Sequence, residues 1–394
     1  MRRSLLAVLP IFVAIALISL ADVIPATNLR STSLALPPNP GPATNGWRLA
    51  GKVTYENLTI LPVVSSQNPD TSEFTTLDEA LANGDVVISE QGDYLRRTRD
   101  GRIPPQLSTG PQVNQLVLVN RGKKPLLLLA GEVVSGGKQD RVIGKDRIVP
   151  IGAAPLPLDV FCVEHGRWTG ASDQFSAAKM MVHPSVREEA AVEKNQSQVW
   201  AAVRGEAKGA VGSSETVTVE RFAAPVITRE ALGAAIASAG TQDYGKIYKS
   251  SLVGASVEGV FEEISRRFQR ATAGLKGEYV VGVVVAFGGE VAWSDIFASS
   301  ALFNSYWPKL LRSYVVEAMT RPGVRETASL DDARDFLRPI TGHTEEESEP
   351  GVYQWRKESV GRLSEIQLAA LAPKPLTLHY LRVLRGDQRE LMAR

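Results

Sequence analysis

The pattern of hydrophobic and polar positions changes part of the way along the chain. Between Trp47 and Trp168, short apolar runs alternate with turn-forming residues, which is typical of β-strands joined by tight connections. One of these runs, from 126 to 134, is apolar enough to lie in the centre of a sheet. The predicted strands fall within residues 53–64, 86–89, 113–119, 126–134, 147–151 and 156–163.

Further along the chain, apolar residues recur at helical spacing. In residues 185–205 they form one face, opposite charged residues that include Arg187. Residues 256–274 carry a clearer apolar stripe, which a glycine ends. A third helix is predicted shortly after the next strands, with Ser305 as its N-cap.

The remaining segments return to strand and loop. Residues 279–297 predict a β-hairpin around Gly288 and Gly289, and residues 376–384 predict a last strand. The acidic stretch 341–351 contains Gly and Pro and is predicted to be a loop.

This order of elements favours an α+β fold, because a doubly wound sheet needs regular strand–helix alternation from the start. We expect a strand-rich N-terminal half, packed with helices and a hairpin from the C-terminal half. One large domain is predicted over residues 47–385, followed by a charged tail over residues 386–394.

The N-terminal residues predict export. Two arginines precede a long apolar run, residues 5–20, and small residues follow it, as in a secretory signal peptide. Cleavage is expected after Ala21 or Ala26; an uncleaved membrane anchor is the alternative. Residues 1–26 are therefore assigned to a signal peptide or anchor, and 27–46 to a Pro-rich linker. The expected location is the periplasm, the envelope or the medium of a bacterium, with membrane contact only through an uncleaved segment.

Composition and motif content limit which binding partners, metals and cofactors are expected. The formal net charge is +1, and no basic excess suggests nucleic acid. The single cysteine, Cys162, rules out an intramolecular disulfide and a Cys-rich metal site, and its apolar neighbours predict a packing role. The four histidines share no ligand spacing, so no metal site is predicted. Neither a dinucleotide fingerprint nor a phosphate-loop motif is present, and the cofactor is unassigned.

The loop Gly136–Arg141 is the first candidate site. Its two glycines permit a tight turn or a close approach to a ligand. Lys138 and Arg141 could hold a phosphate or carboxylate, and Arg141 could do so at two points. Gln139 and Asp140 could orient a hydroxyl group or a base edge. The alternative is an ordinary turn with a structural ion pair between Asp140 and Arg141.

A second group follows two of the predicted strands. Glu132 lies in an apolar context, where burial raises a carboxyl pKa toward acid–base use; the alternative is a solvated strand face. Glu164 is the other candidate acid or base, Arg167 a candidate anion ligand, and Trp168 a candidate stacking surface. For Arg167 the alternative is a structural ion pair, and for Trp168 a place in the core.

Asp295 lies at the end of the predicted hairpin, beside Trp293 and Phe297. It either caps the following turn or completes a site as a base or metal ligand. These two roles stay open from the sequence.

These motifs resemble a known family. Leu-Ala-Gly-Glu at 129–132, Gly-Gly-Lys-Gln-Asp-Arg at 136–141 and Cys-Val-Glu-His-Gly-Arg-Trp at 162–168 are similar to the core pattern of the ARG-and-rhodanese-phosphatase-associated protein domain. Residues 288–297 and 307–314 are similar to its second block, and the strand around His379 fits its end. The resemblance implies no established activity; the association with ADP-ribosylglycohydrolases implies a role near ADP-ribose or nucleotide metabolism. Export argues against such a role.

Two functions fit these observations. The first is an exported domain that binds an anionic small molecule, such as a nucleotide, an ADP-ribose-like compound or a phosphosugar, with or without catalysis. The alternative is a non-catalytic envelope protein that binds another protein or a glycan. Candidate side chains that converge on an open cleft favour the first, and side chains that pair within a closed interior favour the second.

Overall fold

The computed structural model describes residues 46–92, 94, 115–137, 139–163, 174–205, 216–217, 227–242, 244–249, 251–321 and 323–386. All of them belong to one compact unit. The fold is α+β, as the sequence predicts. The predicted N-terminal leader and linker lie outside the described residues.

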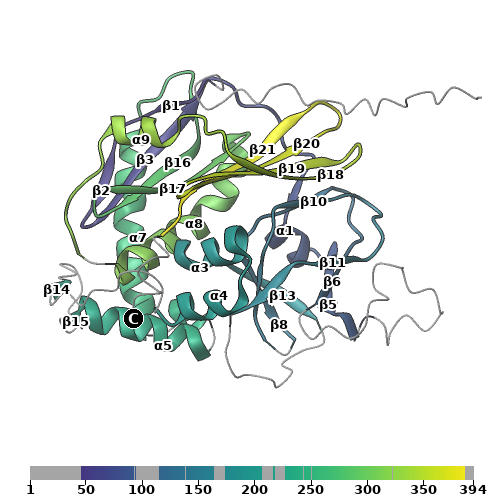
Figure 1. Cartoon of the computed structure of the whole chain (residues 1–394), viewed down its shortest axis with the longest axis horizontal. Helices are drawn as coiled ribbons and strands as arrows, with labels where there is room; N and C mark the ends of the chain where they lie inside the picture. The colour runs from purple at the N-terminus through teal and green to yellow at the C-terminus, as the bar shows by residue number, and fades with distance from the viewer. Residues whose placement is uncertain are drawn as a thin grey trace, which may run out of the picture. The chain divides into compact units, whose positions relative to one another are not determined.

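A nine-stranded sheet organises the fold (Figure 1). Its strand order is β1-β3-β16-β17-β21-β20-β19-β18, with β2 paired to β3, and all its pairings are antiparallel. The sheet joins strands from both ends of the chain. Its members are β1 (Arg48–Leu49), β2 (Val53–Tyr55), β3 (Leu58–Ser65), β16 (Tyr279–Phe287), β17 (Glu290–Phe297), β18 (His343–Glu349), β19 (Tyr353–Val360), β20 (Leu363–Ala370) and β21 (Leu376–Leu384).

Smaller sheets form most of the strand-rich N-terminal half. One contains β10 (Arg147–Val149), β7 (Leu126–Leu128) and β4 (Thr75–Thr76); a second contains β11 (Leu156–Leu158), β6 (Leu116–Asn120) and β5 (Val86–Glu90). A four-stranded sheet has the order β12 (Val160–Cys162), β9 (Arg141–Ile143), β8 (Glu132–Gly136) and β13 (Phe175–Met181). A further pair is β14 (Thr216–Val217) and β15 (Ile227–Thr228).

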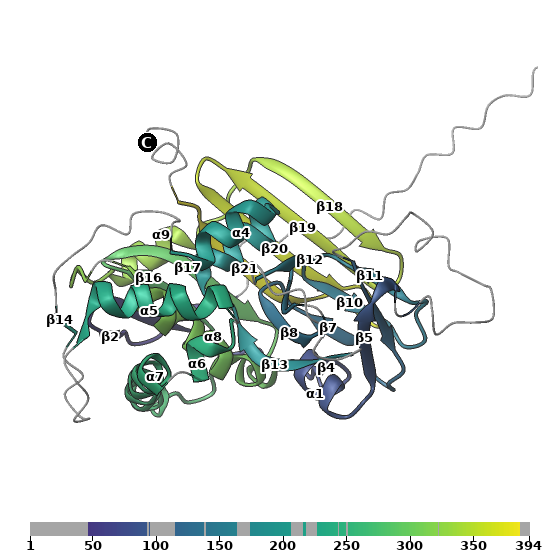
Figure 2. The ribbon, with the colours of Figure 1, turned by 90° about the horizontal axis from the view of Figure 1, so that it is seen from below.

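Helices cover both faces of the large sheet (Figures 1 and 2). On one face, α8 packs against β16 and β17 within the largest hydrophobic core. On the other, α9 covers a smaller core that includes residues of β3 and β16. The helices are α1 (Leu77–Ala82), α3 (Pro184–Glu188), the π-helix η2 (Glu189–Glu193), α4 (Gln196–Val203), α5 (Arg229–Gln242), α6 (Lys246–Lys249), α7 (Ser251–Thr272), α8 (Ser300–Thr320) and α9 (Leu330–Phe336).

The strongest sequence patterns are confirmed. The hairpin of β16 and β17 turns at Gly288 and Gly289, both of which have positive φ, and the last strand has its predicted bounds. The helix predicted over 256–274 is α7, which begins five residues earlier. The strands of the hairpin and the last strand are buried along most of their length, which explains their continuous apolar runs, whereas α7 buries one apolar stripe.

Other predictions are wrong at particular residues. The helix expected over 185–205 is interrupted, because Lys194 takes a left-handed conformation and Asn195 then caps α4. The N-cap of α8 is Ser299 rather than Ser305. Residues 343–349 form the edge strand β18 rather than a loop, because their backbone pairs with β19 and their acidic side chains face solvent or basic partners.

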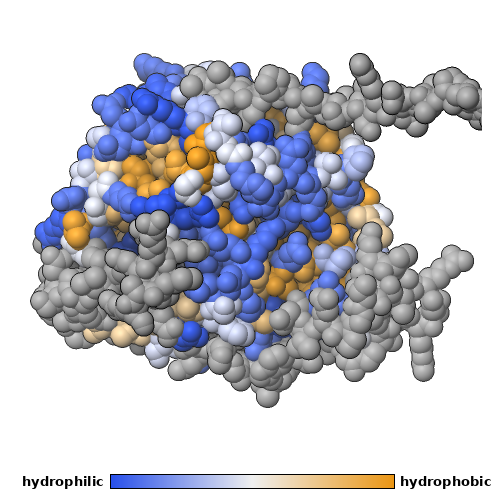
Figure 3. Space-filling view, viewed as in Figure 1, coloured by the Kyte–Doolittle hydropathy of each residue, from blue (hydrophilic) through white to orange (hydrophobic). Residues whose placement is uncertain are grey.

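The surface carries few large hydrophobic side chains. Figure 3 shows hydrophobic residues in several patches between hydrophilic ones on one face. Individual exposed hydrophobic side chains are ordinary on the surface of a folded protein. In the described part of the chain, the large exposed hydrophobic residues are Ile151, Tyr279, Val324, Leu330 and Val360.

Candidate functional site

The turn Leu129–Glu132 connects β7 to β8 and holds one of the predicted motifs. Its backbone groups form hydrogen bonds both within the turn and with residues of other segments. The Leu129 amide donates to Glu132 Oε2 at 2.8 Å, and the Ala130 amide donates to Asp146 Oδ1 at 2.7 Å. Arg187 Nε donates to the Ala130 carbonyl at 2.7 Å. The motif is therefore a junction between the small sheets and α3.

Gly131 is required at this turn for two reasons. Its φ is +97°, which side chains other than glycine rarely adopt. A Cβ atom there would lie 2.7 Å from Cδ of Arg187. The glycine thus lets a buried arginine pack directly on the backbone of the turn.

Glu132 is fully buried, with 1 % exposure, and is paired. Its Oε1 accepts from Lys309 Nζ of α8 at 2.6 Å, and the same ammonium donates to Asp78 of α1 at 2.8 Å. Burial raises the pKa of Glu132, and the Lys309 ammonium opposes that shift. Burial lowers the pKa of Lys309, but the two carboxylates more than offset this effect and leave it raised. The carboxylate therefore joins α8 to the turn, and its predicted acid–base role has no support from this geometry.

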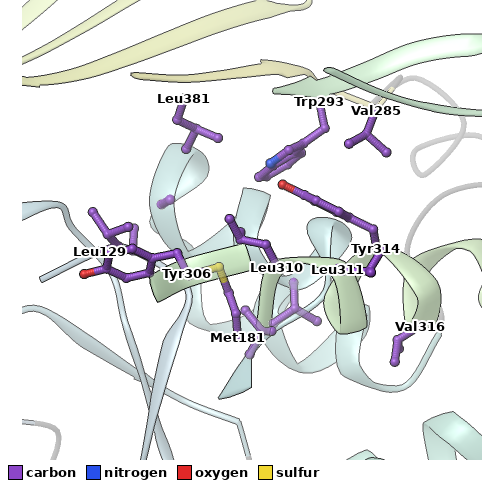
Figure 4. Close-up of a cluster of buried hydrophobic side chains, with 14 of the residues drawn as sticks. Leu129, Met181, Val285, Trp293, Tyr306, Leu310, Leu311, Tyr314, Val316 and Leu381 are labelled. Atoms are coloured by element: carbon purple, nitrogen blue, oxygen red, sulfur yellow. The ribbon is translucent and has the colours of Figure 1, made fainter. Parts of the chain in front are cut away.

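Asp295 lies at the centre of a second buried cluster, in β17. Arg187 Nη1 donates to Oδ1 at 2.8 Å and to Oδ2 at 2.9 Å. Trp293 Nε1 donates to Oδ2 at 2.7 Å, and the Tyr314 hydroxyl donates to the same oxygen. Figure 4 shows the Trp293 ring nitrogen and the Tyr314 hydroxyl pointing toward one another, from β17 and α8. Asp295 does not cap a turn, because its carboxylate is held in the core.

His379 of β21 bridges this cluster to the small sheets. Its Nδ1 lies 2.5 Å from Asp146 Oδ2, and its Nε2 lies 3.0 Å from Asp295 Oδ1. Burial lowers the pKa of His379, but the two carboxylates outweigh burial and leave it raised. Burial likewise works to raise the pKa of Asp295, yet Arg187 and His379 hold it well below its usual range. Two ring nitrogens that both face carboxylates require an imidazolium, since only that form donates twice.

The raised pKa of His379 predicts a pH-dependent stability. We expect the free energy of unfolding to fall as the pH rises above about 6.5, because the native state then keeps a proton that the unfolded chain releases. Burial lowers the pKa of His183, so this histidine affects the free energy of unfolding only below about pH 6.5. Urea unfolding between about pH 6 and pH 9 tests this, and His379→Gln should remove the slope. A wild-type stability that stays level or rises over that interval would contradict the assignment.

Arg141 of β9 is also fully buried, with 0 % exposure, but is satisfied on one side only. Its Nη1 donates to the Gln139 carbonyl at 3.0 Å and to Gln139 Oε1 at 3.3 Å. Its Nε and Nη2 make no hydrogen bond. The nearest charge is Glu90 Oε1, 3.7 Å from Nη2, beyond hydrogen-bond length.

Two other buried arginines differ from Arg141 in how their guanidinium groups are satisfied. Arg187 and Arg382 each leave one nitrogen unsatisfied, but each donates directly to a carboxylate, Asp295 and Glu365 respectively. Arg141 leaves the whole Nε–Nη2 edge without an acceptor. That edge is the one whose two parallel N–H groups match a carboxylate or phosphate.

The other predicted site residues fall into two groups. Asp140 accepts from Ser135 Oγ at 2.7 Å and from the Gly136 amide at 3.3 Å, so Arg141 forms its ion pair with Glu90 rather than with Asp140. Glu132, Asp295 and Arg141 share no hydrogen-bond partner within the described ranges. The remaining predicted residues, which are Lys138, Glu164, Arg167 and Trp168, lie outside the described residues.

Several members of the clusters were missed in the sequence. Arg187 was placed on a solvated helix face, yet it is 1 % exposed. Lys309 and His379 are single polar residues within apolar segments, and such residues need a buried partner. That signal marks them as buried, but it does not say which residues they meet.

The described residues were also compared with the features of membrane-spanning helices and of metal sites. None of its helices combines the length and apolarity needed to cross a bilayer. In the same residues, no three His, Cys, Asp or Glu side chains gather as metal ligands. Cys162 is buried, and its backbone forms hydrogen bonds with the Gln196 side chain.

Comparison with known proteins gives one match. The model of the ARG and Rhodanese-Phosphatase-superfamily-associated Protein domain matches residues 46–382, which is most of the chain. No curated protein and no solved structure matches.

Proposed function

Because the chain belongs to the ARG and Rhodanese-Phosphatase-superfamily-associated Protein domain family, whose name gives no activity, we propose its function from the site alone. We propose that it is an exported domain that binds an anionic small molecule through Arg141. Candidate ligands are nucleotides, ADP-ribose-like compounds and phosphosugars. The single observation that carries the proposal is the unfilled Nε–Nη2 edge of this buried arginine.

The chemistry of that edge supports an anionic ligand. A buried guanidinium without an acceptor loses its hydration, and this loss costs free energy that a bound oxyanion restores. Two oxygens of one carboxylate or phosphate can accept from Nε and Nη2 together. Gln139 holds the opposite edge through Nη1, so the fork is already oriented before a ligand arrives.

Glu90 and Gly137 support the same location. Within the described ranges, Glu90 is the acidic residue that pairs with Arg141, and its side chain is 13 % exposed whereas that of Arg141 is 0 % exposed. A Cβ on Gly137 would lie 3.0 Å from Glu90 Oε1 and closer still to the Phe175 ring. The glycine thus lets Phe175 and Glu90 pack directly on the backbone beside Arg141, and an entering anion would have to displace Glu90.

Binding is favoured over catalysis. Of the three described carboxylates of the predicted site, Asp140 accepts from Ser135 and the Gly136 amide, while Glu132 and Asp295 are enclosed and paired with Lys309 and Arg187. Neither is in contact with Arg141, so neither is placed to act on a ligand held there. These enclosed pairs support a structural part for both residues and by themselves favour the alternative, a non-catalytic envelope protein, so the ligand-binding proposal rests on Arg141.

A thermal-shift screen of the full chain tests the proposal. We expect at least one of ADP-ribose, a nucleotide or a phosphosugar to raise the thermal midpoint, because a ligand at about 100 times its Kd adds about 2.7 kcal/mol to stability. Arg141→Lys, which keeps the charge and loses the fork, should reduce that shift strongly. The proposal fails if no probe shifts the wild-type midpoint, or if the Lys variant shifts equally.

A second variant keeps the test valid if Arg141→Lys does not fold. Glu90→Gln removes the competing negative charge and leaves the guanidinium in place. We expect it to bind the same probe several-fold more tightly, since an anion no longer has to displace a carboxylate. Weaker binding by Glu90→Gln would contradict the assignment of the ligand to this edge.

A further inference from the structure

An open groove of about 490 Å³ lies between β2 and α7. The two elements are neighbours in both ribbon views (Figures 1 and 2). Four of the seven residues that line the groove are charged, and three of those are cations: Lys52, Arg267 and Arg270, with Glu263 as the anion. The volume lies within the range of small-molecule sites, about 300–1,000 Å³.

Glu263, the acidic residue among those that line the groove, forms ion pairs with two arginines of α7. Glu263 accepts from Arg267 Nε at 2.8 Å and from Arg266. These hydrogen bonds hold the pKa of Glu263 at about 2, so its charge is present at neutral pH. Arg267 also donates to the Thr54 carbonyl at 2.7 Å, which ties α7 to β2 and fixes one wall of the groove.

The other two cations have weak and neutral partners only. Lys52 Nζ lies 3.3 Å from the Thr327 hydroxyl and 3.4 Å from the Ala328 carbonyl. Arg270 Nε lies 3.4 Å from the Arg266 carbonyl. Within the described ranges, neither Lys52 nor Arg270 forms an ion pair. Among the described residues, the groove therefore has two lining cations without a counter-ion: Lys52, from the segment before β2, and Arg270, from α7.

We propose that this groove is a second site, separate from Arg141, that binds a small molecule with two or more phosphate charges. An ammonium and a guanidinium that line the same groove suit a diphosphate, which carries a charged group for each of them. The lining is mostly polar, with Val53 and Ala271 as its apolar members, so a hydrophilic ligand fits better than a hydrophobic one. The exposed position predicts binding that weakens as salt concentration rises.

Titration calorimetry with inorganic pyrophosphate tests the proposal. We expect the wild-type chain to bind, and Lys52→Gln and Arg270→Gln each to weaken binding by roughly tenfold. Arg338→Gln is the matched control, because it removes the same charge from an exposed arginine that pairs with Asp335 away from the groove. That control should bind within about twofold of wild type.

The same titration in an Arg141→Lys background separates the two sites. We expect pyrophosphate binding at the groove to persist there, whatever the outcome at Arg141. The proposal is overturned if the wild-type chain does not bind pyrophosphate, or if the groove variants bind as well as Arg338→Gln. Both groove residues are exposed, so their variants should keep the wild-type thermal midpoint, and this can be checked beforehand.

Discussion

Replacing Asp295 by asparagine should destabilise the protein more than any other change of equal size. Both carboxylate oxygens accept from donors only: Arg187 and His379 at Oδ1, and Arg187, Trp293 and Tyr314 at Oδ2. An amide nitrogen placed on either side would face donors, and two buried cations would lose a counter-charge. Breaking a buried ion pair costs about 3–5 kcal/mol, a large part of an ordinary folding free energy.

Urea unfolding of Asp295→Asn beside Asp331→Asn measures this effect. Asp331 is 84 % exposed and pairs with Arg334 on the surface, so its variant should lose less than about 1 kcal/mol. Tyr314→Phe removes one donor and leaves the ion pair, so it should lose about 1–3 kcal/mol and remain measurable if Asp295→Asn does not fold. Equal stability of the two Asn variants would show that the cluster does not stabilise the fold.

Glu132→Gln should be the second most damaging change. Oε1 accepts from the Lys309 ammonium and Oε2 from the Leu129 amide, so the new NH₂ group must face a donor in either orientation. Lys309 keeps Asp78, which limits the loss to about 3 kcal/mol. If Glu132 were instead a functional acid or base, the substitution would leave the stability of the protein nearly unchanged and abolish its activity on a ligand.

Glu258→Gln is the matched control for this substitution. Glu258 forms a two-point ion pair with Arg312, at 2.9 and 3.0 Å, but its side chain is 45 % exposed. The chemical change is the same and only the burial differs, so the control should lose about 0–1 kcal/mol. Comparable losses in both variants, measured by urea unfolding, would contradict the structural part given to Glu132.

The sequence predicts much of the fold because local patterns decide local structure. The hairpin at Gly288 and the final strand follow from apolar runs and a two-residue glycine turn. The strand β18 was missed, because acidic residues seldom form strands and its pairing with β19 is a tertiary effect. The break at Lys194 is not predicted either, because the spacing of apolar residues carries no information about the left-handed backbone conformation of a polar residue.

The candidate site is less predictable, because partners come from distant parts of the chain. The pattern marks Glu132 as a buried carboxylate, but its partner Lys309 is 177 positions away. Asp295 and Arg187 are 108 positions apart, and periodicity assigned Arg187 to the surface. The two-point binding expected of Arg141 stays a prediction, and only coordinates show which edge of its guanidinium lacks an acceptor.

The most direct test of this division, between enclosed structural charges and a ligand site at Arg141, is the thermal midpoint of Glu132→Gln with and without the anionic probe that shifts the wild-type midpoint. We predict a midpoint well below that of wild type in the absence of ligand, and an upward shift with ligand equal to the wild-type shift. A variant with the wild-type midpoint and no response to that probe would place Glu132 in the binding site and contradict the account.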